Sequence, residues 1–153
     1  MTHGELCVIA EKWLKAQGCP IVAKEIVCCS ASGEIPDAIG FKSHLSILIE
    51  CKTSRSDFFA DRKKYFRFEK PEEGMGNYRF YMCKEGIIHL EDLPEKWGLL
   101  WVNDNGKVKK LLAPRGNIWG SMNYEHMWHE KSYRNEYSLM YSLLRRKEKR
   151  SNK

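Results

Sequence analysis

Two carboxylates and a lysine stand at a spacing that could hold a divalent cation. Asp37 follows a proline, and Glu50-Cys51-Lys52 comes after twelve further residues. Glu50 and Lys52 are two residues apart at the end of an apolar run, so on a β-strand their side chains project from the same face. An adjacent antiparallel strand that carries Asp37 would bring both carboxylates into one coordination sphere.

Carboxylate oxygens suit a hard cation such as Mg²⁺ or Mn²⁺, and the Cys51 backbone carbonyl could add a further oxygen. Burial of these charges without such a partner is costly. The cation would polarise a phosphoryl oxygen, while Lys52 would orient the attacking water or stabilise the charge that develops on the phosphate. The alternative is a surface Asp37 and a Glu–Lys pair on an edge strand. The apolar residues 47–49 directly before Glu50 favour the catalytic interpretation.

The elements around these residues are predicted in the order helix, three strands, helix, strand. Apolar residues recur at helical spacing over residues 4–17, and a second helix is expected from Ser54 or Ser56 to about Glu69. The second helix is expected to carry Phe58, Phe59, Tyr65 and Phe66 inward. Apolar and β-branched runs predict strands over residues 21–29, 35–41, 45–51 and 78–83.

The C-terminal third adds a hairpin and a helix. Strands over 97–102 and 107–112 flank Asn105-Gly106, a pair typical of a tight hairpin turn. A last helix is predicted over 132–146, and its apolar stripe is expected to pack against the sheet. That stripe comprises Tyr133, Tyr137, Met140 and Leu144. We therefore expect a single domain over residues 1–153, with a core of about 3–114 and an extension of about 115–153 that ends in a basic tail.

The pattern Pro36-Asp37 and Glu50-Cys51-Lys52, on this order of elements, resembles the PD-(D/E)xK nuclease superfamily. More narrowly, the chain is similar to the MmcB-like branch, a group assigned to DNA repair. That similarity covers about residues 21–114 and rests on residues 50–58 (ECKTSRSDF), 61–63 (DRK), 79–81 (RFY) and 93–100 (LPEKWGLL). The resemblance implies an α/β, restriction-endonuclease-like αβββαβ core with a mixed central sheet. It also implies an Mg²⁺-dependent phosphodiesterase site on Asp37, Glu50 and Lys52.

The resemblance further implies an acidic residue from the first helix that completes the metal site. Glu5 borders the apolar stripe of that helix, whereas Glu11 points nearly opposite. We prefer Glu5 over Glu11 as the additional ligand, with Glu25 from the first strand as a rival. The alternative for Glu5 is a solvated carboxylate favoured by the helix dipole.

The basic surplus favours contact with a polyanion. The net charge is +6 and the pI is near 9.0, which suits a phosphate backbone without indicating a fold. Candidate phosphate contacts follow the ECK motif on the second helix, although a solvated helix face is an equal alternative. These candidates are Arg55, Arg62, Lys63, Lys64 and Arg67.

Other residues point to a reduced, cytoplasmic protein. The six cysteines lack a C-x-x-C pair, so we expect mostly buried thiols. His126 and His129 have H-x-x-H spacing, but no strong third ligand lies nearby, and we interpret them as packing or surface residues. No signal-peptide pattern opens the chain and no apolar run is long enough for a membrane span, so no membrane partner is expected.

Together these features predict a metal-dependent DNA endonuclease that hydrolyses phosphodiester bonds in repair, recombination or mobile-element biology. Mg²⁺ or Mn²⁺ is the expected cofactor, DNA is the expected partner, no small-molecule cofactor is expected, and a homodimer is left open. One alternative is a non-catalytic nucleic-acid or protein-binding module on a nuclease fold. Another is a nuclease that acts on RNA, since the site would contact a phosphodiester in either polymer.

Overall fold

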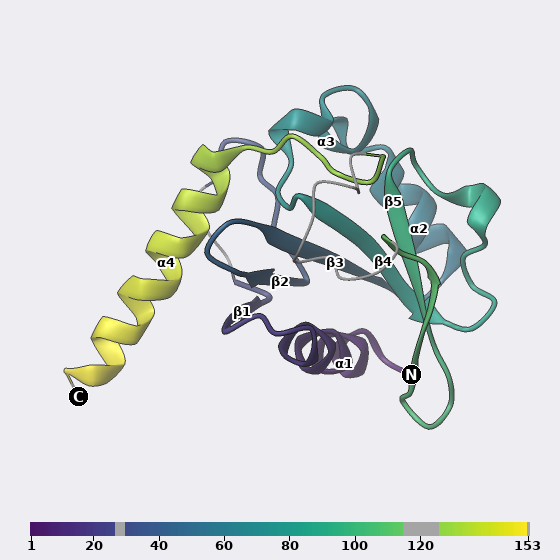
Figure 1. The fold of residues 1–153 in the computed structure, drawn as a ribbon, viewed down its shortest axis with the longest axis horizontal. Helices are drawn as coiled ribbons and strands as arrows, with labels where there is room; N and C mark the ends of the chain where they lie inside the picture. Colours follow the sequence, from purple (N-terminus) through teal and green to yellow (C-terminus); the bar gives the residue numbers. More distant parts are fainter. Residues whose placement is uncertain (27–29, 115–125, 153) are drawn as a thin grey trace.

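A six-stranded mixed sheet with helices against both faces is the centre of this fold (Figure 1). The computed structural model describes residues 1–26, 30–114 and 126–152. The strands are β1 (Ile21–Lys24), β2 (Ala38–Phe41), β3 (Ser46–Lys52), β4 (Tyr78–Lys84), β5 (Trp97–Val102) and β6 (Val108–Leu112). The helices are α1 (His3–Ala16), α2 (Arg55–Arg62), α3 (Tyr65–Phe68) and α4 (Tyr133–Ser151), with 3₁₀ turns η1 (Pro71–Glu73) and η2 (Leu90–Asp92).

The strands lie in the sheet in the order in which they occur in the chain. β1, β2 and β3 are antiparallel neighbours, β3, β4 and β5 are parallel, and β6 returns antiparallel to β5. The parallel step from β3 to β4 runs through α2 and α3, as a crossover connection requires. The predicted α/β fold with a mixed sheet, an αβββαβ order and a C-terminal hairpin is confirmed.

Each face of the sheet buries its own apolar cluster. α1 packs Leu6, Ala10 and Leu14 against the face that carries Ile47 and Ile49. On the opposite face, α2 brings Phe58 to within 4.8 Å of Tyr81, measured between ring centroids, and Tyr81 stacks on Trp97 at 4.3 Å. β3 is therefore covered on both sides and all seven of its residues are buried, which accounts for its nearly continuous apolar run.

Three predicted elements are shorter or divided in the structure. β2 begins at Ala38, because Pro36 has no backbone N–H to give to a ladder. The helix expected over 54–69 is divided: α2 ends at Arg62 and α3 begins at Tyr65. Ser54 caps α2 as predicted, since its side chain accepts a hydrogen bond from the Asp57 N–H. β1 ends at Lys24, and residues 27–29 of the strand predicted over 21–29 lie outside the described residues.

The prediction that the apolar stripe of the last helix packs against the sheet is wrong. Tyr133, Tyr137 and Leu144 are 71%, 72% and 61% exposed, and α4 projects away from the sheet (Figure 1). The body holds the first part of α4 through Leu139, which is buried in the same apolar cluster as Ile39 and Leu48, and through polar contacts. The Glu136 carboxylate accepts hydrogen bonds of 2.8 Å from the Ser46 hydroxyl and from the Gly76 N–H. None of the described helices is both long and apolar enough to cross a membrane.

Candidate active site

Three acidic residues lie side by side at one end of β1, β2 and β3. The β2–β3 ladder pairs Ala38 with Ile49, so the next pair is Asp37 and Glu50. On the other side Lys24 pairs with Ala38, and the Glu25 N–H donates to the Asp37 carbonyl at 3.0 Å. The strand register therefore brings Asp37 and Glu50 together, as the sequence predicts.

Asp37 is tied to both β3 and α1. Its Oδ2 accepts a 2.8 Å hydrogen bond from the Cys51 N–H, and its Oδ1 lies 3.1 Å from His3 Nε2. A strand residue directs its N–H and its C=O toward the same neighbouring strand, so the Cys51 carbonyl also faces the Asp37 side. The Asp37 carboxylate is 15% exposed and remains accessible to solvent.

Glu50 and Lys52 point to the same face of the sheet, as predicted. Lys52 Nζ lies 3.6 Å from Glu50 Oε2 and 3.4 Å from Asp61 Oδ1. The side chains of Glu50 and Lys52 are only 3% and 7% exposed. Each charge is therefore stabilised by its charged neighbours rather than by water. Glu50 and Lys52 are therefore buried, unlike the surface Glu–Lys pair of the alternative interpretation.

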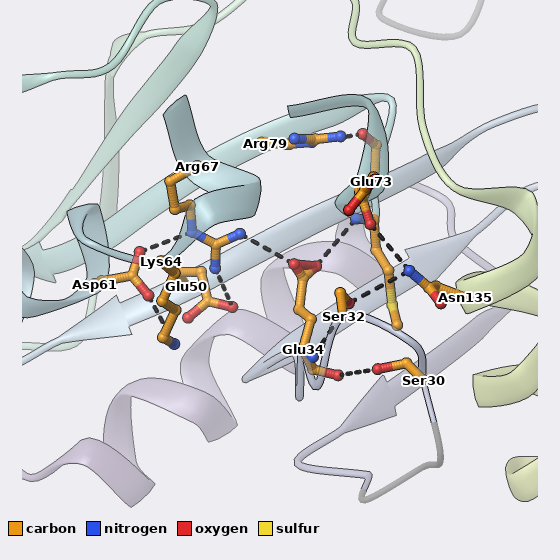
Figure 2. Close-up of polar contacts among 12 residues, drawn as sticks. Ser30, Ser32, Glu34, Glu50, Asp61, Lys64, Arg67, Glu73, Arg79 and Asn135 are labelled. Atoms are coloured by element: carbon orange, nitrogen blue, oxygen red, sulfur yellow. Dashed lines mark hydrogen bonds and ion pairs between the residues drawn. The ribbon is translucent and has the colours of Figure 1, made fainter. Parts of the chain in front are cut away.

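Arg67 contacts three carboxylates, one of which is that of Glu50 (Figure 2). Its Nε donates to Asp61 at 2.8 Å, its Nη1 donates to Glu34 at 3.1 Å, and its Nη2 lies 3.2 Å from Glu50 Oε1. Arg67 was predicted as a surface phosphate contact, and that prediction is wrong because its side chain is buried. α2 ends at Arg62 and α3 begins at Tyr65. Because of this break, Arg67 does not lie on the face that it would occupy in one continuous helix.

The charges of this cluster shift the pKa values of its members in opposite directions. Burial raises the pKa of Glu50 to about 8, with Asp37 and Asp61 adding to the shift and Arg67 opposing it. Burial also disfavours the charged form of Lys52, yet Glu50 and its neighbouring carboxylates outweigh it and raise the pKa of Lys52. For Asp61, burial alone would raise the pKa, but the charge and hydrogen bond of Arg67, the charge of Lys52 and the Tyr81 hydrogen bond together outweigh burial and lower the pKa. Glu50 is thus the carboxylate that a further cation would most stabilise in its charged form.

The donor set at this end of the sheet fits a hard divalent cation. Glu50 Oε1 is buried and accepts no hydrogen bond among the described residues, despite its proximity to Arg67. Asp37 contributes a second, partly exposed carboxylate, and the two ligands supply only oxygen. The residues present therefore suit Mg²⁺ or Mn²⁺.

Glu5 does not approach this set through any described contact. Its carboxylate accepts a 2.6 Å hydrogen bond from the Thr2 N–H and completes a capping box at the start of α1. The residue of α1 that contacts Asp37 is His3, which the sequence reasoning missed. The one sequence feature that could have indicated His3 is its position one helical turn before Cys7 on the same helix. The rival Glu25 lies 3.6 Å from His3 Nδ1.

Asp61 and Glu34 were also missed as members of the cluster. Asp61 follows Phe58 by three residues and so shares the buried face of α2; a charged residue on an apolar helix face was the available signal. The Tyr81 hydroxyl donates to it at 2.6 Å. Glu34 lies on the loop before β2 and also accepts from the Met75 N–H, a long-range contact with no local signature.

The other predicted phosphate contacts lie at or near the surface of α2 and the turn after it. Arg55 makes a two-pronged hydrogen bond to Asp92 at 2.9 and 3.0 Å, so its guanidinium is already engaged. Arg62 lies over the Phe68 ring at 4.8 Å, and Lys64 Nζ lies 2.9 Å from Asp61. Lys63 is exposed. The predicted basic face is thus reduced to three neighbouring side chains at positions 62–64.

No protein-family model matches this chain, and no curated protein matches it. One solved structure is similar, described as "SPO1766 protein of unknown function" from Silicibacter pomeroyi. The match has a TM-score of 0.62 at 21% identity and covers 98% of this chain and 89% of that one. The similarity shows a shared α/β fold over nearly the whole chain.

Proposed function

We propose that this protein is a metal-dependent nuclease with its active site at Asp37, Glu50 and Lys52. The observation that carries the proposal is the position of Asp37 and Glu50 directly beyond the Ala38–Ile49 pair of β2 and β3, with the Asp37 carboxylate bonded to the Cys51 N–H and with Lys52 beside Glu50. Two carboxylates and a lysine at the end of adjacent strands match the pattern of the PD-(D/E)xK superfamily that the sequence resembles.

Asp37 and Glu50 would hold Mg²⁺ or Mn²⁺, with the Cys51 carbonyl as a further oxygen ligand. A divalent cation bound there supplies Lewis-acid polarisation of the phosphodiester. Lys52 acts as a cation rather than as a base, because its carboxylate neighbours raise its pKa and keep it protonated at neutral pH. Its ammonium group donates to the attacking water or to the oxygen on which negative charge develops.

The substrate we propose is DNA. The net charge of +6 supports a polyanionic substrate. Arg62 ends the helix that follows Lys52, and Lys63 and Lys64 come directly after it. The resemblance to the MmcB-like branch favours DNA over RNA and a role in DNA repair, with recombination and mobile-element biology as alternatives. The cysteines, which show no disulfide pattern, favour the cytoplasm.

A non-catalytic module on the same fold is the second candidate, and one observation favours it. Glu50 and Lys52 are almost wholly buried, and Arg67 already lies beside Glu50 as a counter-charge. In such a module Arg67 would permanently take the place of a cation, and the surface at residues 62–64 would bind nucleic acid or protein without cleavage.

A metal-titrated nicking assay separates the two candidates. Parent, Asp37→Asn and Glu50→Gln proteins are purified identically and incubated with duplex, single-stranded and branched DNA and with RNA. We expect cleavage that requires Mg²⁺ or Mn²⁺ in the parent and is lost in both variants. Glu11→Gln changes a carboxylate of α1 that pairs with Lys15 and Lys24, and this control should cleave like the parent.

Cleavage by Glu50→Gln at the parental rate would refute the assigned site. A parent that binds DNA but cuts none of the four substrates with either metal would favour the non-catalytic module. Preferential cleavage of RNA over every DNA substrate would indicate that the protein is a nuclease that acts on RNA.

A further inference from the structure

A second group of metal-ligating side chains lies on the other side of Asp37. His3 and Cys7 are one turn apart on α1, and Glu25 follows β1. One ligand atom from each lies within 4.8 Å of the others. Cys7 Sγ is 3.7 Å from His3 Nδ1, and His3 Nδ1 is 3.6 Å from Glu25 Oε1. These residues bring a thiol, an imidazole and a carboxylate to one point.

Two of the ligand separations are close to those of a tetrahedral site. Zinc bonds of about 2.3 Å to sulfur and about 2.0 to 2.1 Å to nitrogen or oxygen, at tetrahedral angles, separate sulfur from nitrogen by about 3.6 Å and nitrogen from oxygen by about 3.3 Å. The separations of 3.7 and 3.6 Å are close to these values. Cys7 Sγ is also 3.8 Å from His3 Nε2, so the thiol must rotate toward the Nδ1 edge of the imidazole before both can bind one ion. His3 and Glu25 are 42% and 49% exposed, so a water molecule can reach the fourth position.

The second nitrogen of His3 has the partner that a metal-binding imidazole normally has. With Nδ1 on the metal, Nε2 carries the proton and faces Asp37 Oδ1 at 3.1 Å. A ligating histidine commonly donates its other N–H to a carboxylate, which fixes its tautomer and orientation. Asp37 is therefore placed to support the imidazole from one side while its other oxygen is held by the Cys51 N–H.

We propose that His3 Nδ1, Cys7 Sγ and the Glu25 carboxylate form a binding site for a Zn²⁺-class transition ion, with Asp37 as the outer hydrogen-bond partner of His3. Thiolate and imidazole ligands select such ions, whereas the oxygen-only set at Asp37 and Glu50 suits Mg²⁺ or Mn²⁺. The site goes beyond the proposed nuclease centre and shares only Asp37 with it. Binding there would fix the orientation of that carboxylate through His3.

Cobalt is the probe for this site, because Co²⁺ takes zinc positions and reports its ligands in its spectrum. Untagged, reduced protein is titrated with Co²⁺, and Zn²⁺ is then added. We expect one equivalent of Co²⁺ to give a thiolate-to-cobalt charge-transfer band with visible tetrahedral bands, and Zn²⁺ to abolish both. The measurement needs neither DNA nor cleavage, so its outcome is independent of the nuclease proposal.

Three ligand variants and three controls make the assignment specific. Cys7→Ser should remove the charge-transfer band, and His3→Asn and Glu25→Gln, at half-exposed positions that tolerate change, should each weaken Co²⁺ binding at least tenfold. Asp37→Asn should weaken it about 10- to 100-fold as an outer-shell change. Cys83→Ser, at a buried thiol on the opposite face of the sheet, and His44→Asn, at an exposed histidine, should bind like the parent. The Cys28→Ser/Cys29→Ser double variant, at thiols outside the described residues, should also keep the band.

A charge-transfer band that survives Cys7→Ser, or one that disappears in the Cys28→Ser/Cys29→Ser variant, would overturn the assignment. So would parental affinity in both His3→Asn and Glu25→Gln. Parental affinity in Asp37→Asn would overturn the link between the two sites.

Discussion

Arg67 Nη2 lies 3.2 Å from Glu50 Oε1, with both side chains almost completely shielded from solvent. The same guanidinium hydrogen-bonds to Asp61 and Glu34. An arginine that the sequence suggested for a nucleic-acid surface is thus the central counter-charge of a buried cluster.

Arg67→Met should destabilise the protein by about 3 to 5 kcal/mol, because it leaves three carboxylates without their shared counter-charge. Arg62→Met, on the preceding helix over the Phe68 ring, is the matched control and should cost far less. Urea denaturation monitored by circular dichroism measures both. If Arg67→Met left the stability unchanged and weakened DNA binding, Arg67 would be a phosphate contact, as the sequence predicted.

Lys52→Arg should retain the fold but lose about a hundredfold or more in single-turnover cleavage rate. Arginine keeps the positive charge between Glu50 and Asp61, but its planar guanidinium cannot reproduce a compact ammonium donor beside the attacking water. The loss should fall on the chemical step and leave substrate affinity nearly unchanged.

Lys64→Arg is the control for that experiment, since Lys64 also contacts Asp61 but is 48% exposed. It should cleave at nearly the parental rate. If Lys52→Arg cut DNA as fast as Lys64→Arg does, Lys52 would be a structural charge.

The triple variant Arg62→Ala/Lys63→Ala/Lys64→Ala should weaken DNA binding and flatten its salt dependence. Each lost phosphate contact reduces the slope of log affinity against log salt by about one. Lys109→Ala/Lys110→Ala, at exposed positions of β6, removes two positive charges elsewhere and should change the slope by less than the two contacts that these charges would represent. Equal slopes for the two variants would indicate that residues 62–64 do not face DNA.

His129 should make the protein lose stability in acid. Burial lowers its pKa from 6.5 to about 3, and the positive charge of Arg79 adds to the shift. Between pH 6.5 and 3 the unfolded chain therefore binds a proton at His129 that the folded protein does not bind. The contribution of neutral His129 to the free energy of unfolding is complete above pH 6.5 and is lost as the pH falls toward 3.

Relative to His129→Gln, the parent should lose about 1.4 kcal/mol for each pH unit within that window. Urea denaturation at pH 7, 6 and 5 measures the difference. His44→Gln, at an exposed histidine, should follow the parent. Parallel pH profiles for the parent and His129→Gln would show that His129 titrates alike in both states.

Local patterns were sufficient for much of the fold and for the heart of the candidate site. The apolar run before Glu50 predicted a strand covered on both faces, and all residues of β3 are buried. Two-residue periodicity put Glu50 and Lys52 on one face, where they lie 3.6 Å apart. The Asn105-Gly106 pair predicted the hairpin, which the structure contains as β5 and β6. Each of these features depends on neighbouring residues, whose geometry is set by the backbone itself.

Tertiary structure alone decided which faces are covered and which charges meet. Arg67 pairs with Glu34 across 33 residues, and Glu136 anchors α4 to Ser46 across 90. His3 reaches Asp37 only because α1 lies along the sheet at the end of β2. The periodicity of α4 identifies an apolar stripe but not a partner for it, and the stripe faces solvent. Periodicity determines which side chains share a face, whereas burial of that face depends on distant segments that arrive only when the chain folds.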